Sequence, residues 1–333
     1  MEKETLLDIQ SLTVNFYTDN GVVHALNDVN LKLKEGQTLG LAGETGAGKT
    51  TLALSILDLI DSPPGKIESG TITFDGKNLR EATKEEYRKI RGKDISMVFQ
   101  DPMTALNPVY TVADQISEAI YAHQKVSKHE AKLKAIQMLE TVRIPAERAF
   151  EYPHQFSGGM KQRVVIAMAL ACNPRLLIAD EPTTALDVTI QAQVLELMTE
   201  LKAKNNTSMI MITHDLGIVA EVCDTVAIMY AGEVIEYGTL EQIFENPLHP
   251  YTNGLFGSIP DITSDREYLS PIEGLMPDPV NLPQGCKFHP RCKYACPMCS
   301  ERVPEYRDVG DGHCVKCLVY EDAIPTKKVK RYE

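Results

Sequence analysis

Apolar and polar positions alternate with a period of two along the first part of the chain. Residues 12–16 and 22–33 carry this alternation, and a turn-forming Asp-Asn-Gly run at 19–21 separates them. This pattern is typical of antiparallel strands with one buried face. Residues 38–42 then form a short apolar run that enters a glycine-rich turn, and residues 49–60 have helical spacing. The order predicts a strand, a loop and a helix.

The middle of the chain alternates between helical spacing and short apolar runs. Apolar side chains follow a helical period over residues 111–142, and apolar runs fill 95–99, 176–180 and 208–213. Buried strands that alternate with helices pack as a parallel sheet. The pattern therefore predicts an α/β fold with a parallel-sheet core, an antiparallel β subdomain and a helical subdomain at about 101–172.

The pattern changes after about residue 260. Prolines recur over residues 260–283 with little periodicity, which is typical of a linker. Six of the eight cysteines then crowd into residues 286–317. At 333 residues the chain is long enough for about two domains. We therefore expect one domain over residues 1–260, followed by a proline-rich linker and a cysteine-rich metal-binding extension over residues 261–333.

The charge balance narrows the choice of partners. Asp and Glu number 46 against 34 Lys and Arg, a net charge of −12, which argues against binding to polyanions such as nucleic acid. Every apolar run is shorter than the roughly 18 residues of a membrane-spanning helix. The N-terminus lacks the pattern of a secretory signal, so we expect a reducing compartment, where crowded cysteines indicate metal binding before disulfides.

The glycine-rich turn, GETGAGKT at residues 43–50, fits the phosphate-binding pattern G-x-x-x-x-G-K-[ST] between a strand and a helix. Its glycines let backbone amides wrap a phosphate, and the helix N-terminus adds positive partial charge. Lys49 would reach the terminal phosphates, and the Thr50 hydroxyl would bind Mg²⁺. The residues expected to contact the nucleotide are Gly43, Glu44, Thr45, Gly46, Ala47, Gly48, Lys49, Thr50 and Thr51.

A second half of a nucleotide site follows the apolar run at 176–180, which ends in Asp180 and is followed by Glu181. A strand that ends in a carboxylate can deliver it to the magnesium shell. The neighbouring Glu181 can act as the general base that polarises the attacking water. Together with the phosphate-binding loop, this arrangement predicts hydrolysis of a nucleoside triphosphate.

The segment FSGGMKQR at residues 156–163 resembles the signature motif of ABC-transporter ATPases, usually written LSGGQ. Phe and Met replace its first and last residues, whereas Ser157, Gly158 and Gly159 are kept. A serine hydroxyl and two glycine amides at the start of a helix make a second anion-binding terminus. The resemblance implies that two subunits meet head to tail, with the signature of one closing over the γ-phosphate held by the other.

Further motifs of this family occur in order over about residues 6–260. Gln100 resembles the Q-loop glutamine, Asp187 lies in a segment similar to the D-loop, and His214 resembles the switch histidine that contacts the γ-phosphate. Either Phe16 or its neighbour Tyr17 corresponds to the aromatic residue that stacks on adenine. The resemblance implies a RecA-like core that binds ATP and Mg²⁺, with Thr50, Gln100 and Asp180 as magnesium ligands and Glu181, His214 and Gln100 as catalytic residues.

Two later segments, at 245–260 and 285–296, are similar to those that mark the ATPases of oligopeptide and dipeptide importers. This similarity implies two membrane permeases, a second and distinct homologous ATPase subunit, and an extracytoplasmic peptide-binding protein. The chain would be a peripheral subunit at the cytoplasmic face of the membrane. Similar ATPases also serve nickel or oligosaccharides, so the sequence leaves the cargo open, as it does the choice between a hetero- and a homodimer.

The cysteines allow several metal sites. Cys292, Cys296 and Cys299 have the spacing of a radical-SAM iron–sulfur motif, but too few residues follow for the barrel that those enzymes need. The two pairs Cys296/Cys299 and Cys314/Cys317 resemble a zinc ribbon.

The family resemblance instead implies a [4Fe–4S] cluster and leaves Cys296 and Cys314 as extra cysteines. This cluster is our preferred interpretation, with Zn²⁺ and a metal-free tail as alternatives. Its ligands would be Cys286, Cys292, Cys299 and Cys317.

Two other classes of protein fit the sequence less well. ABC ATPases that act on DNA or ribosomes carry a long coiled-coil insertion or two fused nucleotide-binding domains, whereas this chain has one phosphate-binding loop and one signature. An iron–sulfur redox enzyme is disfavoured because the cysteines follow a complete ATPase. The sequence therefore predicts the ATP-hydrolysing subunit of an ABC importer, with peptides as the first choice of cargo.

Overall fold

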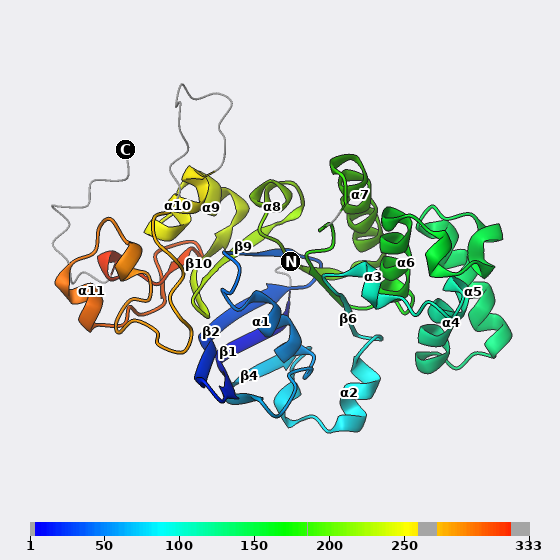
Figure 1. Cartoon of the computed structure of the whole chain (residues 1–333), viewed down its shortest axis with the longest axis horizontal. Coiled ribbons are helices and arrows are strands. Elements are labelled where there is room, and N and C mark those ends of the chain that lie inside the picture. The colour runs from blue at the N-terminus through cyan, green and yellow to red at the C-terminus, as the bar shows by residue number, and fades with distance from the viewer. Residues whose placement is uncertain (1–3, 185, 259–271, 321–333) are drawn as a thin grey trace. The chain divides into compact units, whose positions relative to one another are not determined.

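The computed structural model of the chain describes residues 4–184, 186–258 and 272–320 (Figure 1). Among these residues, every helix is too short or too polar to span a lipid bilayer. The predicted boundary at residues 260–261 lies outside the described residues. The chain divides into two compact units, one formed by residues 1–6, 33–38 and 74–212 and the other by residues 7–32, 39–73 and 213–333.

Three parallel strands run through the first unit. Strand β7 (Leu176–Asp180) pairs with β6 (Ile95–Val98) on one side and with β8 (Ser208–Ile212) on the other. Every residue of β7 and β8 is buried, so both faces of these strands are covered. The three apolar runs of the sequence therefore form the parallel strands that their pattern predicts.

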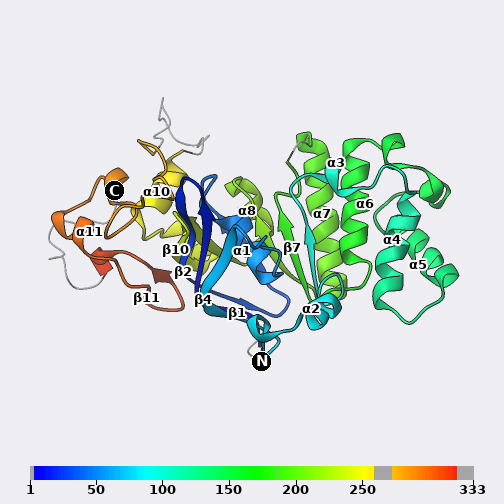
Figure 2. The ribbon, with the colours of Figure 1, turned by 60° about the horizontal axis from the view of Figure 1, so that its bottom comes forward.

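Helices of the first unit pack beside one another, with α4 (Val112–His123) against α5 (Lys128–Thr141) (Figure 2). The sequence shows one helical period over residues 111–142, but the structure has two helices. Gln124 takes an extended backbone, and Ser127 then starts α5 with a capping box. The other elements are α2 (Lys84–Ile90), α3 (Pro102–Ala105), α6 (Gly158–Leu170), α7 (Val188–Asn205), β5 (Lys77–Asn78) and 3₁₀ turns at Leu79–Glu81, Ala146–Phe150 and Pro153–Gln155.

The second unit begins with a long hairpin. Strands β1 (Thr5–Thr18) and β2 (Gly21–Lys34) are neighbours joined by the predicted turn, and β4 (Gly65–Phe74) lies on the other side of β1. Strand β3 (Thr38–Ala42) is completely buried and runs parallel to β9 (Thr225–Tyr230). The predicted N-terminal strands are therefore present, but as two long strands rather than several short ones.

The C-terminal region extends the sheet that contains β3 and β9. Strand β10 (Glu233–Thr239) pairs antiparallel with β9 and with β12 (Cys314–Val315), which in turn pairs with β11 (Arg307–Asp308). The cysteine-rich region is thus part of the second unit's sheet. The unit also contains α1 (Lys49–Ile56), α8 (Leu216–Val222), α9 (Leu240–Glu245), α10 (Pro250–Gly257), α11 (Pro297–Glu301) and 3₁₀ turns at His289–Arg291 and Leu318–Tyr320.

Candidate nucleotide-binding site

The phosphate-binding loop connects β3 to α1, as the sequence predicts, and its shape depends on glycine. Gly43 has a φ of 149°, and a Cβ there would lie 2.2 Å from the backbone oxygen of Met229. Gly48 has a φ of 101°, and its Cβ would lie 2.7 Å from the backbone oxygen of Ala25. Any side chain at these two positions would both strain the backbone and displace a neighbouring strand. The loop is therefore held close to the strands around it.

Lys49 begins α1 and turns back over the loop. Its ammonium group donates to the carbonyl oxygens of Gly43, at 2.6 Å, and Glu44, at 3.0 Å, and the side chain is buried. Thr50, the predicted magnesium ligand, is exposed in the first turn, and Thr51 is half-buried beside it. The lysine, the hydroxyl groups and the amides of the helix N-terminus thus occur together, which is the donor set that a polyphosphate with Mg²⁺ requires.

The predicted general base and the predicted Q-loop glutamine meet in the first unit. The Glu181 carboxylate accepts a hydrogen bond from the Gln100 side-chain amide at 2.8 Å and another from the Thr184 hydroxyl at 3.0 Å. Glu181 follows β7 with a φ of 46°, and its N–H donates to the carbonyl of Ile212. Asp180, at the end of β7, is buried. Thr184 is a contact that the sequence analysis did not identify.

The signature segment starts α6 in the first unit. Ser157 is the N-cap of this helix, but its side chain makes no capping hydrogen bond. A Cβ on Gly159 would lie 2.5 Å from the Ile190 side chain, so this glycine allows close approach to α7. Asp187 caps α7 by accepting from the Ile190 N–H at 2.9 Å. The signature and the residue predicted for the D-loop therefore lie at neighbouring helix starts.

The remaining predicted nucleotide contacts lie in the second unit. His214 lies two residues after the end of β8 and is exposed, and its neighbour Asp215 caps α8. Tyr17 is 50% exposed, and its hydroxyl donates to Glu68 at 2.6 Å, which raises the pKa of the tyrosine. Phe16 is less exposed than Tyr17. The hydrogen bond leaves the Tyr17 ring accessible, so either aromatic residue can still be the one that stacks on adenine.

The four cysteines that the resemblance selects lie close to one another. The pKa of Cys286 and Cys317 is raised to about 12, mainly by burial and also by the neighbouring thiols Cys292 and Cys299. The sulfurs of Cys296 and Cys299 are 3.6 Å apart. Nevertheless, the part of the chain that the structure describes contains no group of three or more His, Cys, Asp or Glu residues arranged to hold a metal ion. The thiols are clustered but do not form a preassembled metal site.

A buried carboxylate that the sequence analysis missed holds the C-terminal region together. Glu236 of β10 is 0% exposed and accepts from the N–H groups of Leu248 and His249, at 2.7 and 2.8 Å. His313, near the cysteines, also contacts this carboxylate at 2.9 Å through Nε2. The only local hint in the sequence is the presence of two acidic residues, Glu233 and Glu236, in an otherwise largely apolar strand. Its partners lie up to 77 residues away, so their identity could not be read from a pattern.

His249 makes the stability of the chain depend on pH. Burial lowers its pKa from the usual 6.5 to about 4, and its Nδ1 accepts from the N–H of Tyr251 at 3.0 Å. In the unfolded chain, where its pKa is near 6.5, His249 binds a proton more readily than in the folded chain. The folded state is therefore most stable above pH 6.5 and loses stability as the pH falls towards 4. Between pH 7 and 5 we expect the free energy of unfolding to drop by about 2 kcal/mol, measured by urea unfolding.

The matched variant for this measurement is His249→Asn, which keeps a side-chain acceptor at the start of α10 but does not titrate in this range. The variant should show a shallower dependence of stability on pH than the natural chain. Equal slopes for the two proteins between pH 5 and 7 would contradict the assignment of this effect to His249.

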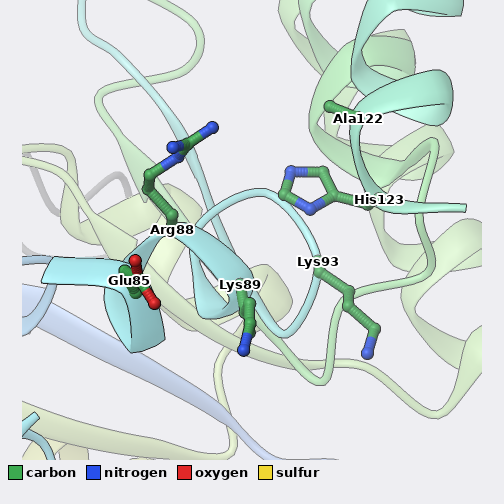
Figure 3. Close-up of a pocket in the computed structure, with 6 residues that line it drawn as sticks. All are labelled: Glu85, Arg88, Lys89, Lys93, Ala122 and His123. Carbon is green, nitrogen blue, oxygen red and sulfur yellow. The ribbon is translucent and has the colours of Figure 1, made fainter. Parts of the chain in front are cut away.

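A separate pocket of about 370 Å³ lies in the first unit (Figure 3). It is bordered by α2 and by the C-terminal end of α4, and four of its six lining residues are basic or imidazole side chains. None of the six belongs to the motifs described above, so this pocket is distinct from the candidate nucleotide site. The lining residues are Glu85, Arg88, Lys89, Lys93, Ala122 and His123.

Comparison with known families and structures assigns both parts of the chain. The ABC transporter family model matches residues 26–184, and the model of the oligopeptide/dipeptide transporter C-terminal region matches residues 235–299. Among solved structures, the dimeric ATP-binding cassette MJ0796, bound to ADP and Pi in a post-hydrolysis state, has a TM-score of 0.64 at 28% identity. This match covers 71% of the chain and 99% of MJ0796 and confirms the predicted ABC ATPase fold.

Curated relatives match along nearly the whole chain. The oligopeptide transport ATP-binding protein OppD of Bacillus subtilis (strain 168) is 51% identical over 322 residues, which are 96% of this chain and 90% of that protein. The dipeptide transport ATP-binding protein DppD of the same strain is 50% identical over 96% of each chain. OppD of Haemophilus influenzae is 48% identical over 94% of this chain and 96% of its own. The chain therefore belongs to the family of ABC transporter ATP-binding proteins that carry the oligopeptide/dipeptide C-terminal region.

Proposed function

We propose that this chain is the ATP-hydrolysing subunit of an ABC importer that takes up oligopeptides or dipeptides. The observation that carries this proposal is the presence, in one chain, of a full set of ABC motifs and of the oligopeptide/dipeptide C-terminal region. Relatives near 50% identity are named as oligopeptide and dipeptide transport ATP-binding proteins. Nickel and short oligosaccharides are the alternative cargoes.

Within this function, the phosphate-binding loop holds the phosphates of ATP with its backbone amides and Lys49. Mg²⁺ would be held by Thr50, Gln100 and Asp180, where it would neutralise charge on the phosphates. Glu181 orients and deprotonates the attacking water. The hydrogen bond from Gln100 to Glu181 supports this role, because it holds the Glu181 carboxylate beside Gln100, which is itself a predicted magnesium ligand.

His214 would contact the γ-phosphate, and Phe16 or Tyr17 would stack on adenine. In a second ATPase subunit, the residues equivalent to Ser157, Gly158 and Gly159 would complete the site, with Asp187 at the subunit interface. The uncapped start of α6 supports an anion-binding role for the signature. The solved MJ0796 cassette, which is similar in fold, is itself described as dimeric.

Membrane permeases are the partners that this family implies. We propose two permeases, a homologous but distinct second ATPase subunit and an extracytoplasmic peptide-binding protein, with this chain peripheral at the cytoplasmic face of the membrane. ATP would bind the closed dimer more tightly than the open one and so shift the population towards it. A groove near Gln100 and the helical subdomain would pass this movement to the permeases, and hydrolysis would reopen the dimer.

Uptake measurements in cells test the cargo. Cells that lack this gene should lose uptake of labelled di- and oligopeptides, and the natural gene should restore it, whereas a gene with the Glu181→Gln change should not. Parallel arms with nickel and a short oligosaccharide separate the alternatives. If peptide uptake is unchanged but uptake of nickel or the oligosaccharide is lost, that compound replaces peptides as the cargo. Unchanged uptake in all arms would overturn the transport function.

For the cysteine-rich region we propose a [4Fe–4S] cluster with Cys286, Cys292, Cys299 and Cys317 as ligands. The influence of Cys292 and Cys299 on the pKa of Cys286 and Cys317 supports the proximity of the four thiols, although Cys296 influences Cys292 and Cys299 in the same way. A bound cluster would provide a structural crosslink and would keep the four sulfurs as thiolates, although burial alone favours the protonated thiols. Zn²⁺ is the alternative.

Metal analysis of chain purified without oxygen checks this proposal. We expect about four iron atoms per chain and the broad visible absorbance of an iron–sulfur cluster. Cys292→Ser should lose the iron, whereas Cys296→Ser, the matched control in the same loop, should keep it. About one zinc per chain without iron would replace the cluster by a zinc site, and no metal in either form would overturn it.

A further inference from the structure

The C-terminal region holds the second residue of the phosphate-binding loop from two sides. The Arg291 guanidinium donates to both carboxylate oxygens of Glu44, at 2.8 and 3.0 Å. The backbone N–H of Glu44 donates to the Tyr251 hydroxyl at 2.9 Å. Tyr251 belongs to the segment at 245–260 and Arg291 to the segment at 285–296. The two stretches that mark the subfamily therefore meet at one residue of the loop.

Contacts other than the one with Glu44 also hold the Arg291 side chain in place. Only 6% of its side chain is exposed, its Nε donates to the carbonyl of Glu273 at 3.0 Å, and its guanidinium lies 5.8 Å from the Tyr230 ring centroid. Phe288, three residues earlier, packs edge-on against the rings of Tyr230 and Tyr251. A partly buried ion pair with two hydrogen bonds and a fixed guanidinium orients the Glu44 carboxylate more strictly than a single point charge would.

Glu44 links this clamp to the lysine of the loop. Its side chain and its N–H are held by the C-terminal region, while its carbonyl oxygen accepts from the Lys49 ammonium at 3.0 Å. A shift of Glu44 would therefore move one of the two backbone oxygens that hold the lysine. Displacements of about 1 Å in a positioned group can cost up to roughly a hundredfold in function.

We propose that Arg291 is a positioning residue for ATP binding: acting through Glu44, with Tyr251 in support, it fixes the start of the phosphate-binding loop and the placement of Lys49. Nucleotide affinity then depends on the folding of the C-terminal region, although Arg291 itself does not touch ATP. This inference rests on the proposed ATPase function and adds to it a residue outside the family's ATP motifs.

The test is the Kd for Mg–ATP of the full chain, measured by titration with a fluorescent ATP analogue. Arg291→Ala should raise the Kd by about tenfold. Arg291→Lys keeps the positive charge but loses the paired guanidinium donors, so its Kd should lie between that of the natural chain and that of Arg291→Ala. Tyr251→Phe, which removes only the hydroxyl, should raise the Kd by a smaller factor. Arg307→Ala, which breaks an exposed ion pair with Glu305 in the same region, should bind like the natural chain.

A double-mutant cycle separates positioning from general damage to the fold. If Arg291 acts through Glu44, the double variant Arg291→Ala with Glu44→Ala should bind ATP no more weakly than the worse single variant. Additive losses, or an unchanged Kd in a folded Arg291→Ala chain, would overturn the inference. A natural chain that fails to bind ATP would instead overturn the proposed function, so the two failures are distinguishable. Thermal melts of each variant show which chains are folded.

Discussion

Replacing Glu181 by Gln should abolish ATP turnover and leave ATP binding intact. The amide has the size of the carboxylate and keeps an oxygen that can accept from Gln100, but it cannot take a proton from water. Loss of a general base typically costs about a hundredfold to ten-thousandfold in rate. We expect a loss in this range for phosphate release by the assembled complex, with an unchanged Kd for Mg–ATP.

Thr184→Ala is the matched control for this prediction. The Thr184 hydroxyl donates to the same carboxylate at 3.0 Å, so its removal loosens Glu181 without removing the base. The expected result is a modest fall in rate, well short of that of Glu181→Gln. Hydrolysis at the natural rate by the Glu181→Gln complex would remove Glu181 from the role of base, and a complex that no longer binds ATP would give it a structural role instead.

The sequence predicted the elements of this chain well where the signal is local. Strands buried on both faces of a parallel sheet are continuous apolar runs in the sequence, so the positions of β7 and β8 were predicted correctly. The phosphate-binding loop is a contiguous motif whose glycines are required by its own backbone, as Gly43 illustrates. The helical period over residues 111–142 predicted helical structure correctly but did not locate the break at Gln124 between α4 and α5, because the period of apolar side chains continues through it.

Contacts between distant segments could not be read from periodicity or motif spacing. Gln100 and Glu181 are 81 residues apart and meet because they lie at the ends of adjacent parallel strands, a relation that only the family resemblance suggested. Arg291 and Glu44 are 247 residues apart, and an arginine in a cysteine-rich segment carries no signal of its buried partner. The pairing of β12 with β10 inside the sheet of the second unit is another such contact, since the proline-rich composition before the cysteines carries no signal of it.

Glu236→Ala should destabilise the chain by about 3 kcal/mol or more, because the carboxylate is the shared acceptor for two backbone N–H groups and for His313. Its removal leaves these donors buried without their partner. Each buried hydrogen-bonding group that loses its partner costs about 1–3 kcal/mol, so the loss of the acceptor shared by these three contacts adds up to about 3 kcal/mol or more. Urea unfolding of the full chain measures the loss.

Two further variants locate the cause of that loss. Glu236→Gln keeps one acceptor oxygen in the same volume and should lose clearly less stability than Glu236→Ala, whereas Glu305→Ala, at an exposed carboxylate, should unfold like the natural chain. Equal stability of the Glu236→Ala and Glu305→Ala chains would show that the buried network contributes nothing net.

Since His313 lies one residue from Cys314 and four from Cys317, unfolding of this network would also release the strand that brings the last cysteines to the sheet. The same carboxylate therefore stabilises both the segment that contains Tyr251 and the cysteine-rich region, which together hold Glu44 in the phosphate-binding loop.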